Sequence, residues 1–370
     1  MIIDADAHVT VPEQFFVERL SSLPVDHRPR PIHLEGREFW IIDGRLAPKL
    51  GGYGQGTPGG FGPGGAGALS LSNRGGAHDY YVDNVPGRLA DMDLEEVELQ
   101  VLYPDLILVN PGIENPDVAS AISRGWNDHL ADRCASASDR LKRVAVVALQ
   151  DPTEATRELR RSVEELGCVG AVIPPLLGNK LLNHRDFEPF FEEANRLSAA
   201  IAIHGVTGVY DMPWQDLFDS WFGSRTVAVP ISYMVSMVSL FDGHMLERYP
   251  NVRFGFFEAG GCGWVPYWTE RLDEQIARRN SQDVLASDYV RHGRLFFSCE
   301  PDEQNLAQVV EAVGDQCIMY ASDYPHGDSK WPETVSSFRS IPGLSHESQE
   351  RILGTNAMRY YGRLTNGGPS

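Results

Sequence analysis

Residues 2–9 read Ile-Ile-Asp-Ala-Asp-Ala-His-Val, an apolar run that predicts a buried β-strand with polar groups near its end. Residues two apart point the same way in a strand, so Asp6 and His8 share a face. Similar apolar runs recur along the chain, at 99–103, 143–149, 168–174, 200–204, 252–257, 294–298 and 317–322. Most of these eight runs are continuous rather than alternating, as expected for strands buried on both faces.

The stretches between these runs carry helical spacing. Asp151-Pro152-Thr153 opens one helix with a capping residue and a proline in the first turn, and Asn115-Pro116-Asp117 opens another. Further helical patterns cover 187–197, 227–249, 264–279, 302–313 and 347–361. Repeated strand–helix alternation predicts a closed (β/α)₈ TIM barrel, formed as a single domain over 1–370. A doubly wound open sheet is the rival, but no GxGxxG sequence follows any strand.

One long insertion, at about 10–97, interrupts this alternation after the first strand. Within it, Gly51–Gly67 holds ten glycines, and such a segment cannot bury a core of its own. Two interpretations stay open: a tolerated surface insertion, or a mobile lid or oligomer contact at the barrel mouth. A phosphate-binding loop is excluded, because no GKS or GKT follows.

The amino-acid composition limits the kinds of partner and location that we expect for this protein. The 370 residues carry a net charge of −19, which argues against a nucleic-acid partner. No apolar run reaches the length of a membrane span, and the start lacks the pattern of a signal peptide. The five cysteines form no CxxC pair, so we expect neither a disulfide framework nor a cysteine–zinc site. A cytoplasmic protein is the expectation.

Metal-capable side chains end four of the predicted strands. Asp6 and His8 lie on the first, His204 ends the fifth, Glu258 ends the sixth and Asp323 follows the eighth, with His326 close behind. Each residue alone could be structural, as a cap, a turn residue or a core histidine. Their shared position at the end of the barrel that carries active sites favours a functional site. Two histidines and two carboxylates suit Zn²⁺ or another borderline divalent metal.

These sequences together resemble the amidohydrolase superfamily, and within it the branch of aminocarboxymuconate-semialdehyde and γ-resorcylate decarboxylases. The resemblance covers most of the chain. It rests on residues 2–8 (IIDADAH), 86–93 (PGRLADMD), 101–104 (VLYP), 204–205 (HG), 258–266 (EAGGCGWVP), 322–326 (SDYPH) and 354–357 (GTNA).

The resemblance implies one divalent metal, Zn²⁺ first and Mn²⁺ second, held by His8, His204 and Asp323. Asp6 stands where many relatives have the first histidine of an HxH pair, and some decarboxylases of this branch have a carboxylate there. Glu258 stands where relatives commonly have a histidine. No lysine ends the fourth strand, where Ile173-Pro174-Pro175 stands, so a dinuclear site with a carbamylated lysine is not expected.

The preferred function is nonoxidative decarboxylation of a small aromatic or unsaturated acid. Asp323 would move the proton, with Glu258 or His326 assisting. Hydrolysis of an amide or lactone at the same metal is the alternative, and a metal-free binding barrel is the second. Arg88 and Trp214 are candidate substrate contacts, although Arg88 could equally form a surface salt bridge and Trp214 could pack under its loop. We also expect a homo-oligomer, dimer or tetramer.

Overall fold

The computed structural model describes residues 1–9, 11, 13–34, 37–47, 82–135, 139–205, 217–218, 221–280, 283–326 and 329–364. The glycine-rich segment 51–67, for which a lid or an oligomer contact was considered, lies outside the described residues.

Eight parallel strands form one sheet whose spatial order follows the chain. They are β1 (Ile2–Val9), β5 (Val97–Pro104), β6 (Leu141–Val146), β7 (Gly170–Ile173), β8 (Ala200–His204), β9 (Arg253–Phe257), β10 (Leu295–Cys299) and β11 (Ile318–Tyr320). The segment that directly follows the last strand is hydrogen-bonded to the first: Asp323 N donates to Asp6 O at 3.2 Å, and His8 N donates to Tyr324 O at 2.6 Å. The predicted barrel and all eight of its predicted strands are therefore confirmed.

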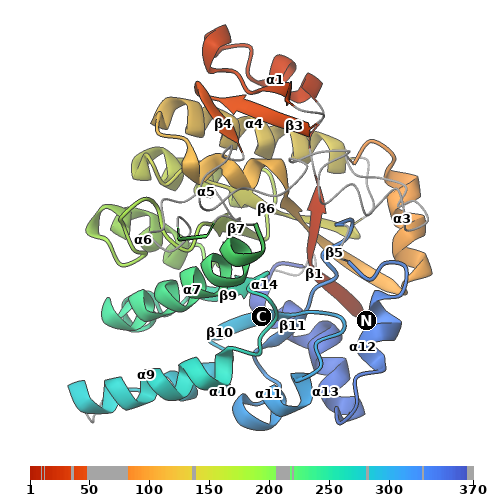
Figure 1. Cartoon of the computed structure of the whole chain (residues 1–370), viewed down its shortest axis with the longest axis vertical. Helices are drawn as coiled ribbons and strands as arrows, with labels where there is room; N and C mark the ends of the chain where they lie inside the picture. The colour runs from red at the N-terminus through yellow and green to blue at the C-terminus, as the bar shows by residue number, and fades with distance from the viewer. Residues whose placement is uncertain are drawn as a thin grey trace.

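Helices lie around the outside of the strands (Figure 1). The longer ones are α3 (Val85–Leu94), α4 (Pro116–Cys134), α5 (Pro152–Glu164), α6 (Glu188–Arg196), α7 (Trp221–Asp242), α9 (Val265–Arg279) and α11 (Leu306–Val313). The shorter ones are α1 (Glu13–Arg19), α8 (Met245–Arg248), α10 (Ala286–Arg291), α12 (Thr334–Arg339), α13 (His346–Glu350) and α14 (Asn356–Tyr361).

The predicted helix starts are capped as the sequence indicates. The Asn115 side chain accepts from the first-turn amides of α4, and the Asp151 side chain does the same for α5. The helical pattern at 227–249 divides into α7 and α8, and the one at 347–361 becomes α13, a π-helical turn at Arg351–Thr355, and α14.

A small antiparallel sheet was not predicted. It consists of β2 (Arg30–Leu34), β3 (Arg37–Ile42) and β4 (Arg45–Ala47), and lies beside α1 at the top of Figure 1. Asp43-Gly44, both with positive φ, makes the two-residue turn between β3 and β4. The Asp43 carboxylate accepts from Asn115 N at 3.3 Å, which ties this sheet to the start of α4 at the barrel mouth.

The barrel is packed beneath that mouth. β1 is buried along its whole length. Tyr361 donates its hydroxyl to Ala5 O at 2.6 Å, so the Tyr103 hydroxyl, 2.7 Å away, donates to Tyr361. The Tyr103 ring lies 5.7 Å from that of His204, which makes it part of the floor below the site. Among the described residues, no helix combines the length and apolar character needed to cross a lipid bilayer.

Candidate metal and active site

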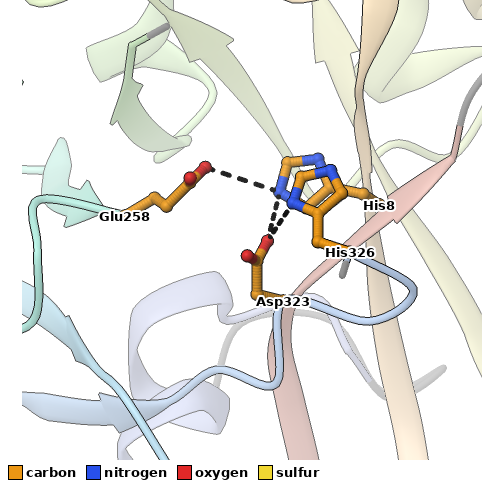
Figure 2. Close-up of side chains that lie close together, drawn as sticks. All are labelled: His8, Glu258, Asp323 and His326. Atoms are coloured by element: carbon orange, nitrogen blue, oxygen red, sulfur yellow. Dashed lines mark ion pairs between the residues drawn. The ribbon is translucent and has the colours of Figure 1, made fainter. Parts of the chain in front are cut away.

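The barrel brings the predicted site residues together at the carboxyl ends of its strands. Asp6 and His8 come from β1, His204 from β8, Glu258 from the turn after β9 and Asp323 from the loop after β11. Asp6, His8 and His204 offer ligand atoms within 4.8 Å of one another, and so do His8, Glu258, Asp323 and His326. In Figure 2 Glu258, Asp323 and His326 lie around the ring of His8. The two groups share His8, so they describe one centre.

The spacing of these atoms suits a shared metal ion. His8 Nε2 lies 3.2 Å from Asp323 Oδ1 and 3.6 Å from Asp6 Oδ1. His204 Nε2 lies 3.5 Å from Asp6 Oδ2. Charged hydrogen bonds are shorter, at about 2.7–2.9 Å. Ligands bound at about 2.0–2.2 Å from one ion lie roughly 3.0–3.5 Å apart. The observed distances fit atoms bound to the same metal ion better than atoms hydrogen-bonded directly to one another.

Buried polar atoms point to the same centre. His8 Nδ1 lies 3.0 Å from Pro104 O, and because a carbonyl only accepts, Nδ1 carries a proton and Nε2 is the nitrogen left to bind either a second proton or a metal ion. Within the described part of the chain, His8 Nε2, Asp6 Oδ1 and both ring nitrogens of His204 have no hydrogen-bond partner. Buried groups of this kind are costly unless something binds them, so the residues present fit a divalent cation.

The carboxylates dominate the electrostatics of the metal-free site. Burial opposes protonation of His8 and His326 also repels its charge, but Asp6 and Asp323 outweigh both and raise the pKa of His8 to about 9. Burial would raise the pKa of Asp323, yet the neighbouring His326 and His8 hold that pKa well below its usual range. The site thus attracts positive charge, whether as protons or as a metal ion.

Glu258 faces the same two imidazoles. Its Oε2 lies 3.3 Å from His204 Nε2 and 3.9 Å from His8 Nε2. Glu258 adopts a positive φ of 55°, and its amide donates to Ser298 Oγ at 3.1 Å. The side chain is 19% exposed, against 2% for that of Asp6. A partly open carboxylate next to a buried centre can reach both a metal and a bound substrate.

His326 lies on the open side of the centre. Its ring stacks on His8 with centroids 4.1 Å apart, and its Nδ1 lies 2.7 Å from Asp323 Oδ1. Its Nε2 lies 3.6 Å from Asp105 Oδ1. Burial would lower the pKa of His326, but the two carboxylates raise it well above the usual value. Sequence reasoning missed Asp105, although it directly follows the end of β5 and so could have been included with the other strand-end carboxylates.

Of the two predicted substrate contacts, Arg88 and Trp214, the structure describes only Arg88. Arg88 is fully buried rather than on a helix surface, so the surface salt bridge considered for it is wrong. It donates from Nε to Gln100 Oε1 at 2.7 Å and from Nη2 to His8 O at 3.1 Å. This placement supports a role in orienting His8, and the predicted contact with a substrate stays a prediction. Trp214 lies outside the described residues.

An apolar pocket adjoins His204. It lies at the carboxyl ends of β5, β6 and β7, and its wall includes Val147 directly after β6, Ile173 at the end of β7 and Pro174 directly after it. Ile107 and Leu108, from the 3₁₀ helix Leu106–Gly112, complete much of the wall. The pocket therefore offers an uncharged surface next to a centre rich in carboxylates.

The model of the Amidohydrolase family matches residues 3–363. The chain belongs to this family of enzymes. It is 24% identical over 283 residues to 2-amino-3-carboxymuconate-6-semialdehyde decarboxylase of Dictyostelium discoideum, covering 74% of this chain and 76% of the relative. It is 27% identical over 294 residues to γ-resorcylate decarboxylase of Rhizobium radiobacter, covering 74% and 86%. The resemblance inferred from the sequence is confirmed.

Solved structures share the fold. The 2,6-dihydroxybenzoate decarboxylase from Rhizobium aligns with a TM-score of 0.68 at 20% identity, covering 97% of this chain and 98% of its own. A dihydroxybenzoic acid decarboxylase from Polaromonas, solved with bound manganese and an inhibitor, gives 0.69 at 18% identity, covering 97% and 96%. The likeness extends over the whole barrel, and both proteins are decarboxylases by name.

Proposed function

We propose that this amidohydrolase catalyses nonoxidative decarboxylation of a small aromatic carboxylic acid at one divalent metal. The observation that carries the proposal is the convergence of Asp6, His8, His204 and Asp323 with the spacing of metal ligands. The relatives named as decarboxylases direct the choice among the chemistries open to such a site.

Asp6, His8, His204 and Asp323 would hold the metal, and His8 is already oriented for this by Pro104. When bound, the ion would supply positive charge that stabilises the negative charge of the substrate acid. Zn²⁺ was the first expectation from the sequence. The two carboxylates in this ligand set and the manganese in the Polaromonas structure support Mn²⁺ as well.

The chain's own part in the reaction is proton transfer. A proton that rests on His326 and passes through Asp323 forms a new C–H bond at the carbon that bears the substrate carboxylate, and the ring supplies the electron pair of that bond. The C–C bond to that carboxylate then breaks, its electron pair returns to the ring, and CO₂ leaves. His326 Nδ1, 2.7 Å from Asp323 Oδ1, is placed to restore the proton to Asp323. His326 is partly open to solvent, from which that proton can come.

The apolar pocket beside His204 supports an aromatic substrate. Its lining by Ile107, Leu108 and Ile173 is apolar and adjoins a proposed metal ligand, as is typical of a surface beside an aromatic ring. The same wall would bury a second charged group without a partner, which is costly.

The test is metal-dependent release of ¹³CO₂ from carboxyl-labelled hydroxybenzoic acids, followed by membrane-inlet mass spectrometry. The protein is first stripped of metal and then reloaded with Mn²⁺ or Zn²⁺, and His204→Ala serves as the control. We expect ¹³CO₂ from the reloaded wild type only. Release of amine or alcohol from amide or lactone substrates, without CO₂ from any acid, would instead support the hydrolase alternative.

A homo-oligomer and a cytoplasmic location stay predictions. In support of the first, α7 carries an exposed or partly exposed row of apolar residues at Val227, Ile231, Met234 and Val238. A row of this kind is common at contacts between subunits. Light scattering coupled to size-exclusion chromatography gives the mass in solution, and a monomer at all concentrations would contradict the prediction.

A further inference from the structure

The join between the first and last barrel strands lies directly beneath the candidate metal site. Asp323 N donates to Asp6 O, and His8 N donates to Tyr324 O. Three of the four proposed ligands, Asp6, His8 and Asp323, therefore lie on the two sides of this join. Any slippage there would move the ligands of one side relative to those of the other.

A buried carboxylate bridges the join. Asp4 is 1% exposed. Its Oδ1 accepts from Ser322 N at 2.9 Å, and its Oδ2 accepts from Ser322 Oγ at 2.5 Å. Asp4 stands two residues before Asp6, and Ser322 immediately precedes Asp323. One side-chain bridge thus fixes the spacing between the two ligand-bearing segments.

The bridge continues through two more buried side chains. Gln100, on β5, donates from Nε2 to Asp4 Oδ2 at 3.1 Å and accepts from Arg88 Nε at 2.7 Å. Arg88 then donates to the His8 carbonyl at 3.1 Å, with its guanidinium 4.9 Å from the centre of the Tyr324 ring. The path that begins at Ser322, beside Asp323, therefore ends on the backbone of His8.

We infer that Ser322, Asp4, Gln100 and Arg88 form a positioning chain that holds His8, Asp6 and Asp323 in one ligand geometry. This inference rests on the proposed metal centre. A buried guanidinium and a buried carboxylate are costly, and apolar side chains of similar volume often stabilise a fold as well or better. We therefore attribute to these four polar residues the role of fixing the relative position of metal ligands that lie on the two sides of the join.

The same part of the molecule offers a matched control. Glu95 is also a buried carboxylate, 6% exposed, and accepts from Thr334 N at 3.0 Å, from Val335 N at 2.9 Å and from the Thr334 hydroxyl. It joins the end of α3 to the start of α12, and neither Glu95 nor Thr334 belongs to the described candidate metal groups. Loss of its hydroxyl partner perturbs the fold without touching a ligand.

The experiment compares Ser322→Ala and Gln100→Met with Thr334→Val. Metal-free full-length protein is titrated with Mn²⁺, and free Mn²⁺ is followed by electron paramagnetic resonance. We expect Ser322→Ala and Gln100→Met to raise the Mn²⁺ dissociation constant about 10–100-fold, the usual effect of removing groups that orient metal ligands. Thr334→Val should leave this constant unchanged, and Ser322→Thr, which keeps the hydroxyl, should restore wild-type binding.

Thermal unfolding of the metal-free proteins separates positioning from general damage. The melting temperatures of Ser322→Ala and Thr334→Val should fall by similar amounts, while only Ser322→Ala loses metal affinity. Equal Mn²⁺ affinity in wild type, Ser322→Ala and Gln100→Met would overturn the inference and leave the proposed function intact. A wild type that binds neither Mn²⁺ nor Zn²⁺ would overturn the proposed metal centre, and the inference with it.

Discussion

His8 Nδ1 lies 3.0 Å from the carbonyl oxygen of Pro104, and this contact decides which nitrogen of the ring faces the site. With Nδ1 donating, Nε2 faces Asp6 and Asp323, where it binds a proton in the metal-free protein and would offer its lone pair to a metal ion. The last residue of β5 thus orients a proposed metal ligand that lies on β1. The metal-binding capacity of the site follows from how the strands are joined as much as from the ligand residues.

His204→Ala should lose the metal. His204 is buried, and a methyl group cannot replace an imidazole ligand. We expect metal affinity to fall by on the order of 100-fold or more, beyond the usual effect of changes around ligands. Elemental analysis after dialysis measures this, with wild type as reference. Retention of a full equivalent by the variant would remove His204 from the ligand set.

Asp323→Asn should separate binding from chemistry. Asp6, His8 and His204 remain as ligands, so the metal should stay largely bound. Turnover should fall on the order of 10²–10⁴-fold, the usual contribution of a positioned acid or base. Steady-state kinetics at saturating metal provide the measurement. Near-full activity under those conditions would exclude Asp323 as the proton carrier.

Asp105→Asn should slow turnover without releasing metal. The change removes the negative charge 3.6 Å from His326 Nε2, so His326 is less firmly oriented and less readily protonated. We expect kcat to fall about tenfold or more. Asp117→Asn, at an exposed position in the first turn of α4, is the matched control. Equal kcat values for the two variants would mean that Asp105 plays no part in turnover.

The stability of the metal-free protein should depend on pH through His8. Its pKa rises from 6.5 to about 9 in the folded chain. Because the folded pKa is the higher one, protonated His8 contributes stability that is complete below pH 6.5 and is lost as pH rises through 9. The melting temperature of the metal-free protein should therefore fall over this window.

The metal affinity should show the opposite dependence and rise with pH, because the ion and the proton compete for His8 Nε2. Mn²⁺ affinity should rise by up to about tenfold per pH unit between pH 6.5 and 9 for one displaced proton. Calorimetric titrations at several pH values measure it. In metal-free His8→Gln, which has no imidazole to titrate, the melting temperature should fall less between pH 6.5 and 9 than in the metal-free wild type. A wild-type affinity that does not change with pH would contradict the proposed competition.

The barrel could be predicted from the sequence because its strands are buried on both faces and read as continuous apolar runs. The strands Ile2–Val9 and Ala200–His204 match their predicted bounds in full, and the others shift by a few residues. The sheet at Arg30–Ala47 was missed because its strands are short and lie in the long insertion, although Asp43-Gly44 is a strong hairpin signal.

The site residues could be predicted where position along a strand implies position in space. Asp6, His8, His204, Glu258 and Asp323 all lie near or just after the carboxyl ends of strands, so the barrel brings them together. Arg88 could not be placed in this way, because it lies on a helix and reaches the site through Gln100 and the His8 backbone. A contact of that kind depends on how a helix packs, which local spacing does not reveal.

The central claim is that one divalent metal lies among Asp6, His8, His204 and Asp323. Anomalous diffraction at the manganese edge, from crystals grown with Mn²⁺, tests it most directly. The account predicts one strong anomalous peak about 2.0–2.3 Å from the imidazole nitrogens of His8 and His204 and from carboxylate oxygens of Asp6 and Asp323. A peak elsewhere, or no peak in a well-ordered barrel at saturating Mn²⁺, would contradict it.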